Sequence, residues 1–143
     1  MARDVIKNLT DLDNYAKHLA ARLRGGAVVA LSGELGAGKT TLVQSVGRAL
    51  GVRANILSPT FTILKVYPVA KQDYHQLCHV DLYRVSDFTV TPGLIEYIGD
   101  KDTVCFIEWA EKIKSFLPKN TLWLTIKITA GELRVIIQKN KLR

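Results

Sequence analysis

Cysteine is scarce in this sequence, with Cys78 and Cys105 the two among 143 residues. Two cysteines are too few for a disulfide framework, and neither lies in a Cys-x-x-Cys pair or in a Cys/His cluster with zinc-site spacing. Cys105 lies in the apolar run Val104–Ile107, so we expect it to be a buried and inert thiol. The sequence therefore gives no sign of a disulfide-stabilised or zinc-stabilised domain.

Long apolar runs are also absent. No segment reaches the ~20 apolar residues that a membrane-spanning helix needs. The segment Met1–Lys7 carries charges where a signal peptide would need an apolar stretch. We therefore expect a cytoplasmic protein with no membrane partner.

Nothing marks a second domain, because the chain has no internal repeat, low-complexity tract or composition change. With 48% apolar residues it can bury a core, so we expect one domain over residues 1–143. The 20 Lys and Arg against 13 Asp and Glu give a net charge of +7. Such an excess attracts phosphate-bearing ligands, nucleic acid or acidic protein surfaces, but many small proteins use it for solubility alone.

Two helices follow from the spacing of apolar residues. Thr10 and Asp13 form a capping-box pattern before a helical repeat that Gly25–Gly26 would stop. A second helix is expected from Lys39, with Gly51 ending it in the left-handed conformation.

Short strands separate these helices and follow them. Ala27–Leu31 has no polar alternation, which is typical of a strand covered on both faces in a parallel sheet. Thr129–Glu132 separates the last two strands, which predicts a C-terminal antiparallel hairpin. Polar segments at Pro68–Gln76 and Ser86–Pro92 are expected to be surface loops. The remaining strands are expected at Phe61–Tyr67, Cys78–Tyr83, Thr103–Ile107, Leu122–Ile128 and Leu133–Gln138.

The segment from Gly33 to Thr40 fits G-x-x-x-x-G-K-[ST] at every fixed position and lies between a buried strand and a helix. Its glycines let successive backbone N–H groups turn toward one anion, and the helix start adds a positive dipole. Lys39 is expected to reach the β and γ phosphates of ATP, and the Thr40 hydroxyl to ligate Mg²⁺. The fold class predicted is therefore α/β: a P-loop NTPase-like mixed, mostly parallel sheet flanked by helices, with the C-terminal hairpin.

The motif alone does not select a reaction. A switch GTPase is disfavoured, because the sequence has no D-x-x-G segment and no [NT]-K-x-D guanine-binding segment. A small-molecule kinase needs an acceptor pocket and an arginine-bearing lid, and the long loops carry few arginines. An ATPase fits best, while a kinase and an adaptor that binds ATP but barely cleaves it remain alternatives.

Two carboxylates suit the magnesium site. Glu108 follows an apolar run and would lie at the carboxyl edge of a strand, where ligands bind in open α/β sheets. Asp81 occupies a similar edge. Either acid could instead be a solvated residue at a strand end.

Four segments together resemble the TsaE family, formerly called YjeE, the bacterial ATPases of the tRNA threonylcarbamoyladenosine modification pathway. The four segments are Leu31–Thr41, Ser58–Thr62, His79–Arg84 and Ile107–Trp109 with Glu111. They occur in the family's order and spacing, and the resemblance covers most of the chain.

The resemblance implies a role for each site residue. Thr40 and Glu108 would hold magnesium, the latter directly or through water. Thr60 would belong to a switch-like loop that senses the γ phosphate, and Asp81 would orient the attacking water. The catalytic set implied is Lys39, Thr60, Asp81 and Glu108. The nucleotide would be held by Glu34, Leu35, Gly36, Ala37, Gly38, Lys39, Thr40 and Thr41.

Four further residues and the partners complete the expectation. Tyr83 and Arg84 would shape the adjoining surface, and Arg134 would approach the nucleotide. Trp109 would either pack at its strand end or contact nucleotide or partner. By resemblance the partners are the TsaD and TsaB subunits, with tRNA bound by the assembly, and ATP hydrolysis drives or resets that assembly. Turnover of the isolated chain should be slow, because no arginine finger is evident in the motifs.

Overall fold

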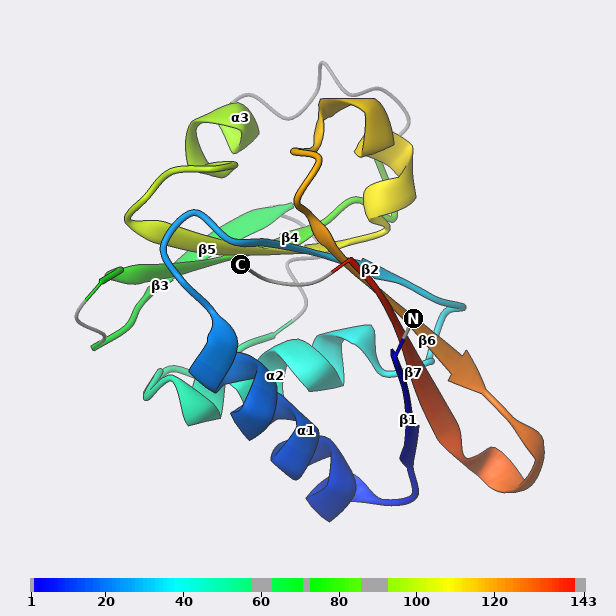
Figure 1. Cartoon of the computed structure of the whole chain (residues 1–143). Helices are drawn as coiled ribbons and strands as arrows, with labels where there is room; N and C mark the ends of the chain where they lie inside the picture. Colours follow the sequence, from blue (N-terminus) through cyan, green and yellow to red (C-terminus); the bar gives the residue numbers. More distant parts are fainter. Residues whose placement is uncertain (1, 58–62, 71–72, 86–92, 141–143) are drawn as a thin grey trace.

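The computed structural model describes residues 2–57, 63–70, 73–85 and 93–140, and within them one seven-stranded sheet lies between two layers of helices (Figure 1). The strand order is β1-β7-β6-β2-β5-β4-β3. The inner strands β6, β2, β5 and β4 are parallel to one another, and the outer pairs β1–β7, β6–β7 and β3–β4 are antiparallel. This confirms the mixed α/β sheet with a C-terminal hairpin. The strands are β1 (Ala2–Ile6), β2 (Val28–Ser32), β3 (Leu64–Pro68), β4 (Gln76–Asp81), β5 (Thr103–Glu108), β6 (Leu122–Ile128) and β7 (Arg134–Lys139).

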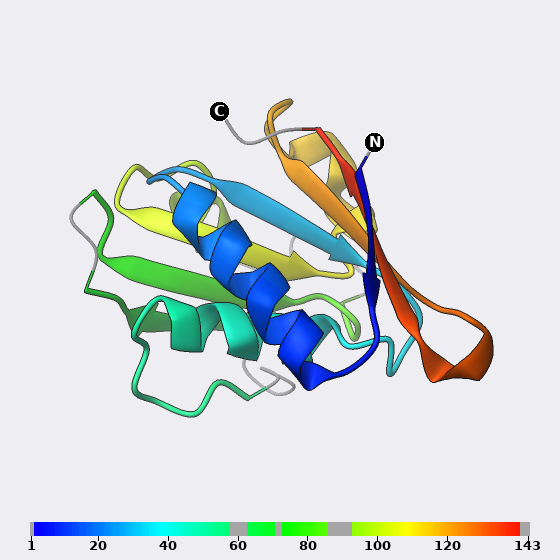
Figure 2. The same cartoon turned by 60° about the horizontal axis from the view of Figure 1, so that its bottom comes forward.

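The helices are divided between the two faces of the sheet. Helices α1 (Leu9–Arg22) and α2 (Lys39–Ala49) lie side by side on one face, as Figures 1 and 2 show. Helix α3 (Leu94–Tyr97) and the 3₁₀ helix η2 (Ala110–Phe116) cover the other face, and the short 3₁₀ helix η3 (Ala130–Glu132) joins β6 to β7. None of the described helices is both long and apolar enough to cross a bilayer.

Alternating residues of the central strands fill two separate cores. Leu31 and Phe106 pack under α1 and α2, while Ala30 and Ile107, one position away, pack under α3 and η2. Because both faces are covered, the central strands are apolar throughout, which is why the uninterrupted run ending at Leu31 predicted a buried strand. The same alternation decides which strand-end side chains face α2.

The start of α1 differs from the expected capping box. Its cap is Asn8, whose side chain accepts a hydrogen bond from the Asp11 backbone N–H at 2.8 Å. The prediction from Thr10 and Asp13 was wrong, because the Asp13 carboxylate instead accepts a hydrogen bond from the Ser45 hydroxyl of α2 at 2.8 Å. Asn8, two residues before Thr10, supplies the capping side chain. Asp13 instead joins α1 to α2 through its hydrogen bond with Ser45.

Strand β1 was not predicted. Four of its five residues are exposed and Ile6 alone is buried. Because so little of the strand is buried, its sequence lacks the apolar alternation by which strands are predicted. It pairs along β7 at the edge of the sheet. The start of α2 at Lys39 and the left-handed Gly51, with a φ of 80°, are confirmed. The expected loop Ser86–Pro92 lies outside the described residues.

Candidate functional site

The glycine loop, residues Gly33–Gly38, joins the end of β2 to the start of α2. Gly33, Gly36 and Gly38 have φ angles of 148°, 82° and 112°, a region that side chains disfavour. A Cβ on Gly33 would also come within 2.5 Å of the carbonyl oxygen of Ile126 on β6. The strand-loop-helix arrangement expected from the motif is therefore confirmed, and its path explains the glycines.

The N-terminus of α2 points out of this loop without a cap. Gly38 has no capping side chain, and the first turn carries no acidic residue. The N–H of Leu42 makes the first helical bond, to the Gly38 carbonyl at 2.9 Å. The preceding N–H groups of the first turn have no partner within the helix and carry its positive dipole, which favours an anion at this position.

Lys39 lies at the centre of this arrangement and is buried, with 5% of its surface exposed. Its Nζ donates hydrogen bonds to the carbonyls of Gly33 at 2.5 Å and Glu34 at 3.1 Å, and lies 4.2 Å from the ring centroid of Trp109. Burial lowers the pKa of the Lys39 ammonium below its usual value, and nearby carboxylates, Glu108 foremost, oppose that shift. A partly desolvated cation of this kind interacts strongly with an added anion.

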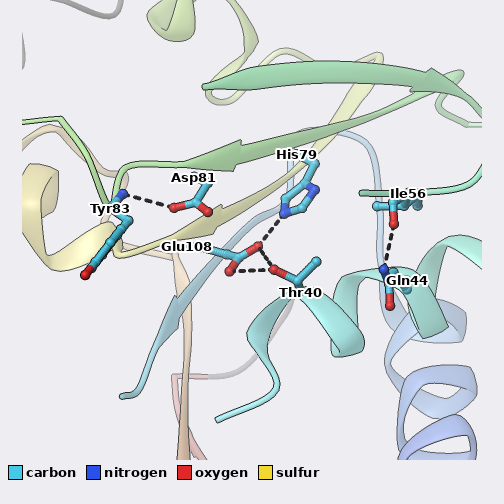
Figure 3. Close-up of polar contacts among 7 residues, drawn as sticks. All are labelled: Thr40, Gln44, Ile56, His79, Asp81, Tyr83 and Glu108. Atoms are coloured by element: carbon cyan, nitrogen blue, oxygen red, sulfur yellow. Dashed lines mark hydrogen bonds and ion pairs between the residues drawn. The ribbon is translucent and has the colours of Figure 1, made fainter. Parts of the chain in front are cut away.

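Two acids face the glycine loop from the sheet. Asp81 ends β4 and Glu108 ends β5, and the two are register partners on neighbouring parallel strands. Glu108 is buried, whereas Asp81 is half-buried and accepts a hydrogen bond from the Tyr83 N–H at 2.9 Å (Figure 3). The structure thus brings both predicted acids to one edge of the sheet beside the start of α2.

Thr40, Glu108 and His79 form a continuous polar chain (Figure 3). The Thr40 hydroxyl donates to the Glu108 carboxylate, with Oγ1 2.8 Å from Oε2 and 3.0 Å from Oε1. His79 Nε2 lies 2.6 Å from the same Oε2. Sequence reasoning gave His79 no role. The available signal was its position two residues before Asp81, since alternate residues of a strand share one face.

These side chains surround a cavity of about 420 Å³, the main cavity of the site. The glycine loop and α2 form one wall, and the ends of β4 and β5 form the other. Its lining residues are Leu35, Gly36, Gly38, Lys39, Thr40, Thr41, Ile63, Asp81, Tyr83, Arg84, Glu108 and Trp109. Glu34 contributes its carbonyl to Lys39, and the predicted residue Thr60 lies outside the described residues.

A second cavity of about 290 Å³ adjoins the main cavity, and Gly36, Gly38 and Thr41 line both. Ala37 and Arg134 line it too, and Arg134 donates from Nε to the Ala37 carbonyl at 3.1 Å, which places it against the glycine loop. Its apolar surface comes from β1, α1, β6 and β7, four segments whose meeting no local pattern predicts. These apolar residues are Ile6, Leu9, Leu12, Ile126 and Ile136.

Trp109 both packs and lines the main cavity. Its backbone is left-handed, with φ 59° and ψ 36°, and its N–H donates to the Leu31 carbonyl at 3.1 Å. Its ring lies 5.1 Å from that of Tyr83, between centroids, and also contacts the Lys39 ammonium. A non-glycine residue in this conformation costs on the order of 1 kcal/mol, which the surrounding contacts offset.

The oxygen donors at this edge of the sheet suit magnesium if phosphate supplies further ligands. Among the described residues, no group of three or more His, Cys, Asp and Glu side chains could hold a metal ion unaided. Mg²⁺, however, usually takes only one or two protein carboxylates and completes its shell with substrate phosphates and water. Thr40, Asp81 and Glu108 therefore fit an ion that arrives together with phosphate.

Comparison with known proteins gives one consistent result. The family described as "Threonylcarbamoyl adenosine biosynthesis protein TsaE" matches residues 6–136. Proteins named "tRNA threonylcarbamoyladenosine biosynthesis protein TsaE" are similar: that of Bacillus subtilis is 40% identical over 85% of this chain and 74% of its own, and that of Treponema pallidum is 35% identical over 94% and 97%. The crystal structure of Bacillus subtilis YdiB superposes with a TM-score of 0.77 at 32% identity, over 94% of this chain and 82% of that one. The chain therefore belongs to the TsaE family, whose proteins take part in tRNA threonylcarbamoyladenosine biosynthesis.

Proposed function

We propose that this chain is a magnesium-dependent ATPase that hydrolyses ATP to drive or reset a TsaD–TsaB complex that modifies the tRNA adenosine next to the anticodon. One observation carries the proposal: a buried lysine, an uncapped helix N-terminus and two strand-end carboxylates meet around one cavity of about 420 Å³. That combination matches what a triphosphate and its metal ion require.

The triphosphate would lie along the glycine loop. The first-turn N–H groups of α2 would bind its β and γ phosphates, and the Lys39 ammonium would exchange its carbonyl acceptors Gly33 and Glu34 for phosphate oxygens. Bonds between two charged groups are stronger than bonds to carbonyls, so this exchange favours binding.

Thr40 and Glu108 are the residues that would hold magnesium, which neutralises charge on the transferring phosphoryl group when it is bound. The Thr40 hydroxyl already donates to Glu108, and such a bond leaves the Thr40 oxygen with lone pairs for a cation. Asp81, in register with Glu108, would orient the attacking water, and Thr60 would sense the γ phosphate.

The adenine base would occupy the second cavity. This cavity continues from the main cavity past Gly38 and Thr41, where the α phosphate and ribose would leave the loop. Its apolar residues offer a surface for a flat purine ring, and ligand pockets typically combine such surfaces with few polar groups. Arg134 would flank the base from β7.

A protein partner fits the mouth of the main cavity. Leu35 is 69% exposed and Tyr83 is 47% exposed, and both line that cavity. Apolar side chains exposed beside a reaction site suit a partner that covers them and excludes water. TsaD and TsaB are the proposed partners, and tRNA would reach the chain through them.

Single-turnover hydrolysis tests this proposal. ATP labelled in the γ phosphate is mixed with excess protein, alone and with purified TsaD, TsaB and tRNA. We expect slow release of inorganic phosphate from the chain alone, faster release with the partners, and none above background with Lys39→Ala. Transfer of label to an acceptor other than water would indicate a kinase. Tight binding without hydrolysis under every condition would indicate an adaptor.

A further inference from the structure

His79 is a buried polar residue beneath the main cavity that does not line it. Its side chain is fully buried, and its Nε2 lies 2.6 Å from Glu108 Oε2. It stands two residues before Asp81 on β4, so the two side chains share the face of the sheet that α2 covers. His79 therefore reaches the site through its contact with Glu108.

The hydrogen-bond pattern identifies the proton on the imidazole ring. A carboxylate accepts hydrogen bonds, so Nε2 carries the proton and donates it to Glu108. Nδ1 is buried and has no hydrogen-bond partner within the described part of the chain. A proton on Nδ1 would be buried without an acceptor, which likewise makes Nε2 the donor.

Glu108 is consequently held between two donors on different elements. The Thr40 hydroxyl on α2 lies within hydrogen-bond distance of both carboxylate oxygens, and His79 Nε2 on β4 donates to Oε2, the oxygen nearer to Thr40. Because a glutamate side chain has several rotatable bonds, a single donor would leave its carboxylate free to turn. The second donor fixes the plane of the carboxylate relative to the Thr40 hydroxyl.

We propose that His79 is a positioning residue for magnesium: its Nε2–H holds the Glu108 carboxylate in the orientation that, with Thr40, receives the metal ion of the nucleotide complex. The inference rests on the proposed magnesium-ATP site and adds a residue to it that touches neither nucleotide nor metal. Groups that orient metal-binding carboxylates in this way typically change metal affinity by about 10–100-fold when removed.

Two variants separate positioning from simple packing. In His79→Gln the side-chain amide places an N–H near the position of Nε2, whereas in His79→Asn the amide is one carbon shorter and matches Nδ1. Both are polar and similar in size, so their effects on folding should be alike. Phe106→Leu is the matched control, because Phe106 is the register partner of His79 and is equally buried.

The experiment measures the dissociation constant of ATP by calorimetry, once with Mg²⁺ and once with EDTA. Wild-type protein should bind more tightly with Mg²⁺. His79→Asn should lose about tenfold or more of the Mg²⁺-dependent gain, with affinity in EDTA unchanged, and His79→Gln should keep most of the gain. Phe106→Leu should lower the unfolding temperature without altering the ratio of the two constants.

Three results would overturn the inference: equal losses with Mg²⁺ and EDTA, no loss in His79→Asn, or equal behaviour of the Asn and Gln variants. Each assigns His79 to packing and leaves the proposed function intact. If wild-type protein showed no Mg²⁺-dependent binding, the proposed site itself would be wrong, and that outcome is visible before any variant is compared.

Discussion

Thr40 Oγ1 lies 2.8 Å and 3.0 Å from the two carboxylate oxygens of Glu108, although the residues are 68 positions apart in the chain. The bond joins the first turn of α2 to the carboxyl end of β5. It sets the hydroxyl and the carboxylate side by side, as two ligands of one small cation must be.

Removing either partner of this pair should weaken magnesium-dependent ATP binding. Thr40→Val and Glu108→Gln should each lower affinity by about tenfold or more, and the double variant should lose little beyond the larger single loss, because both groups serve one ion. Titration calorimetry with Mg²⁺ checks this. Thr125→Val is the control, because it removes a hydroxyl contact with Ser32 and neither residue lines either cavity. Additive losses would argue against a shared ion.

The glycine loop should tolerate alanine unequally. Gly36→Ala meets open space but keeps a left-handed φ, which costs about 1–2 kcal/mol. Gly33→Ala adds a contact of 2.5 Å with the backbone oxygen of Ile126, so its unfolding free energy should fall by about 1–3 kcal/mol more. Urea unfolding of both variants measures the difference. Equal losses would show that β6 yields at Ile126.

The Asp13 carboxylate should make stability depend on pH. Its hydrogen bonds from Ser45 and then from Arg48 hold its pKa below the usual 3.8. A carboxylate with a lowered pKa stabilises the folded state above its unfolded-chain pKa, and that contribution disappears as the pH falls through the folded pKa. Asp13→Asn should therefore cost more stability at pH 7 than at pH 3. The effect is modest, because water screens this half-exposed group.

Urea unfolding at both pH values tests this, with a matched background as control. In the double variant Ser45→Ala, Arg48→Met, the further change Asp13→Asn should no longer show the pH-dependent loss. The same loss at pH 7 and pH 3 in the native background would remove the assigned cause.

The sequence predicted those parts of the site that depend on local structure. Lys39 and Thr40 follow from one motif, and Asp81 and Glu108 from their places at strand ends, where the chain's own pattern determines the geometry. The position of His79 two residues before Asp81 put it on the same strand face, but its contact with Glu108 also requires β4 to lie beside β5 with Asp81 opposite Glu108. That register is set by long-range packing.

Packing between elements likewise explains the remaining differences. Asn8 and Thr10 are both suitable helix caps by residue type. In the structure Asn8 is the cap, and Asp13 makes its hydrogen bond with Ser45 on the neighbouring helix. The second cavity depends on β1 and β7 folding against the glycine loop. Strand β1 has too little apolar character to be recognised alone.

The proposed placement of the adenine base in the second cavity predicts a selective effect at Leu9. This residue lines the second cavity yet is 69% exposed, so Leu9→Ser should leave the fold intact. It should weaken ATP binding by about 3- to 10-fold, as expected for the loss of roughly 1 kcal/mol of apolar contact, and leave binding of inorganic triphosphate unchanged. Competition binding compares the two ligands. Val5→Ser, an exposed apolar residue outside this cavity, should affect neither.

A crystal structure with Mn²⁺ and a non-hydrolysable ATP analogue would show whether metal and triphosphate bind at the glycine loop, because anomalous scattering locates the metal independently of the protein. We predict a peak between Thr40 Oγ1 and Glu108, with the β and γ phosphates against the glycine loop and Lys39. A triphosphate bound elsewhere, or a metal peak away from the Thr40–Glu108 pair, would contradict it.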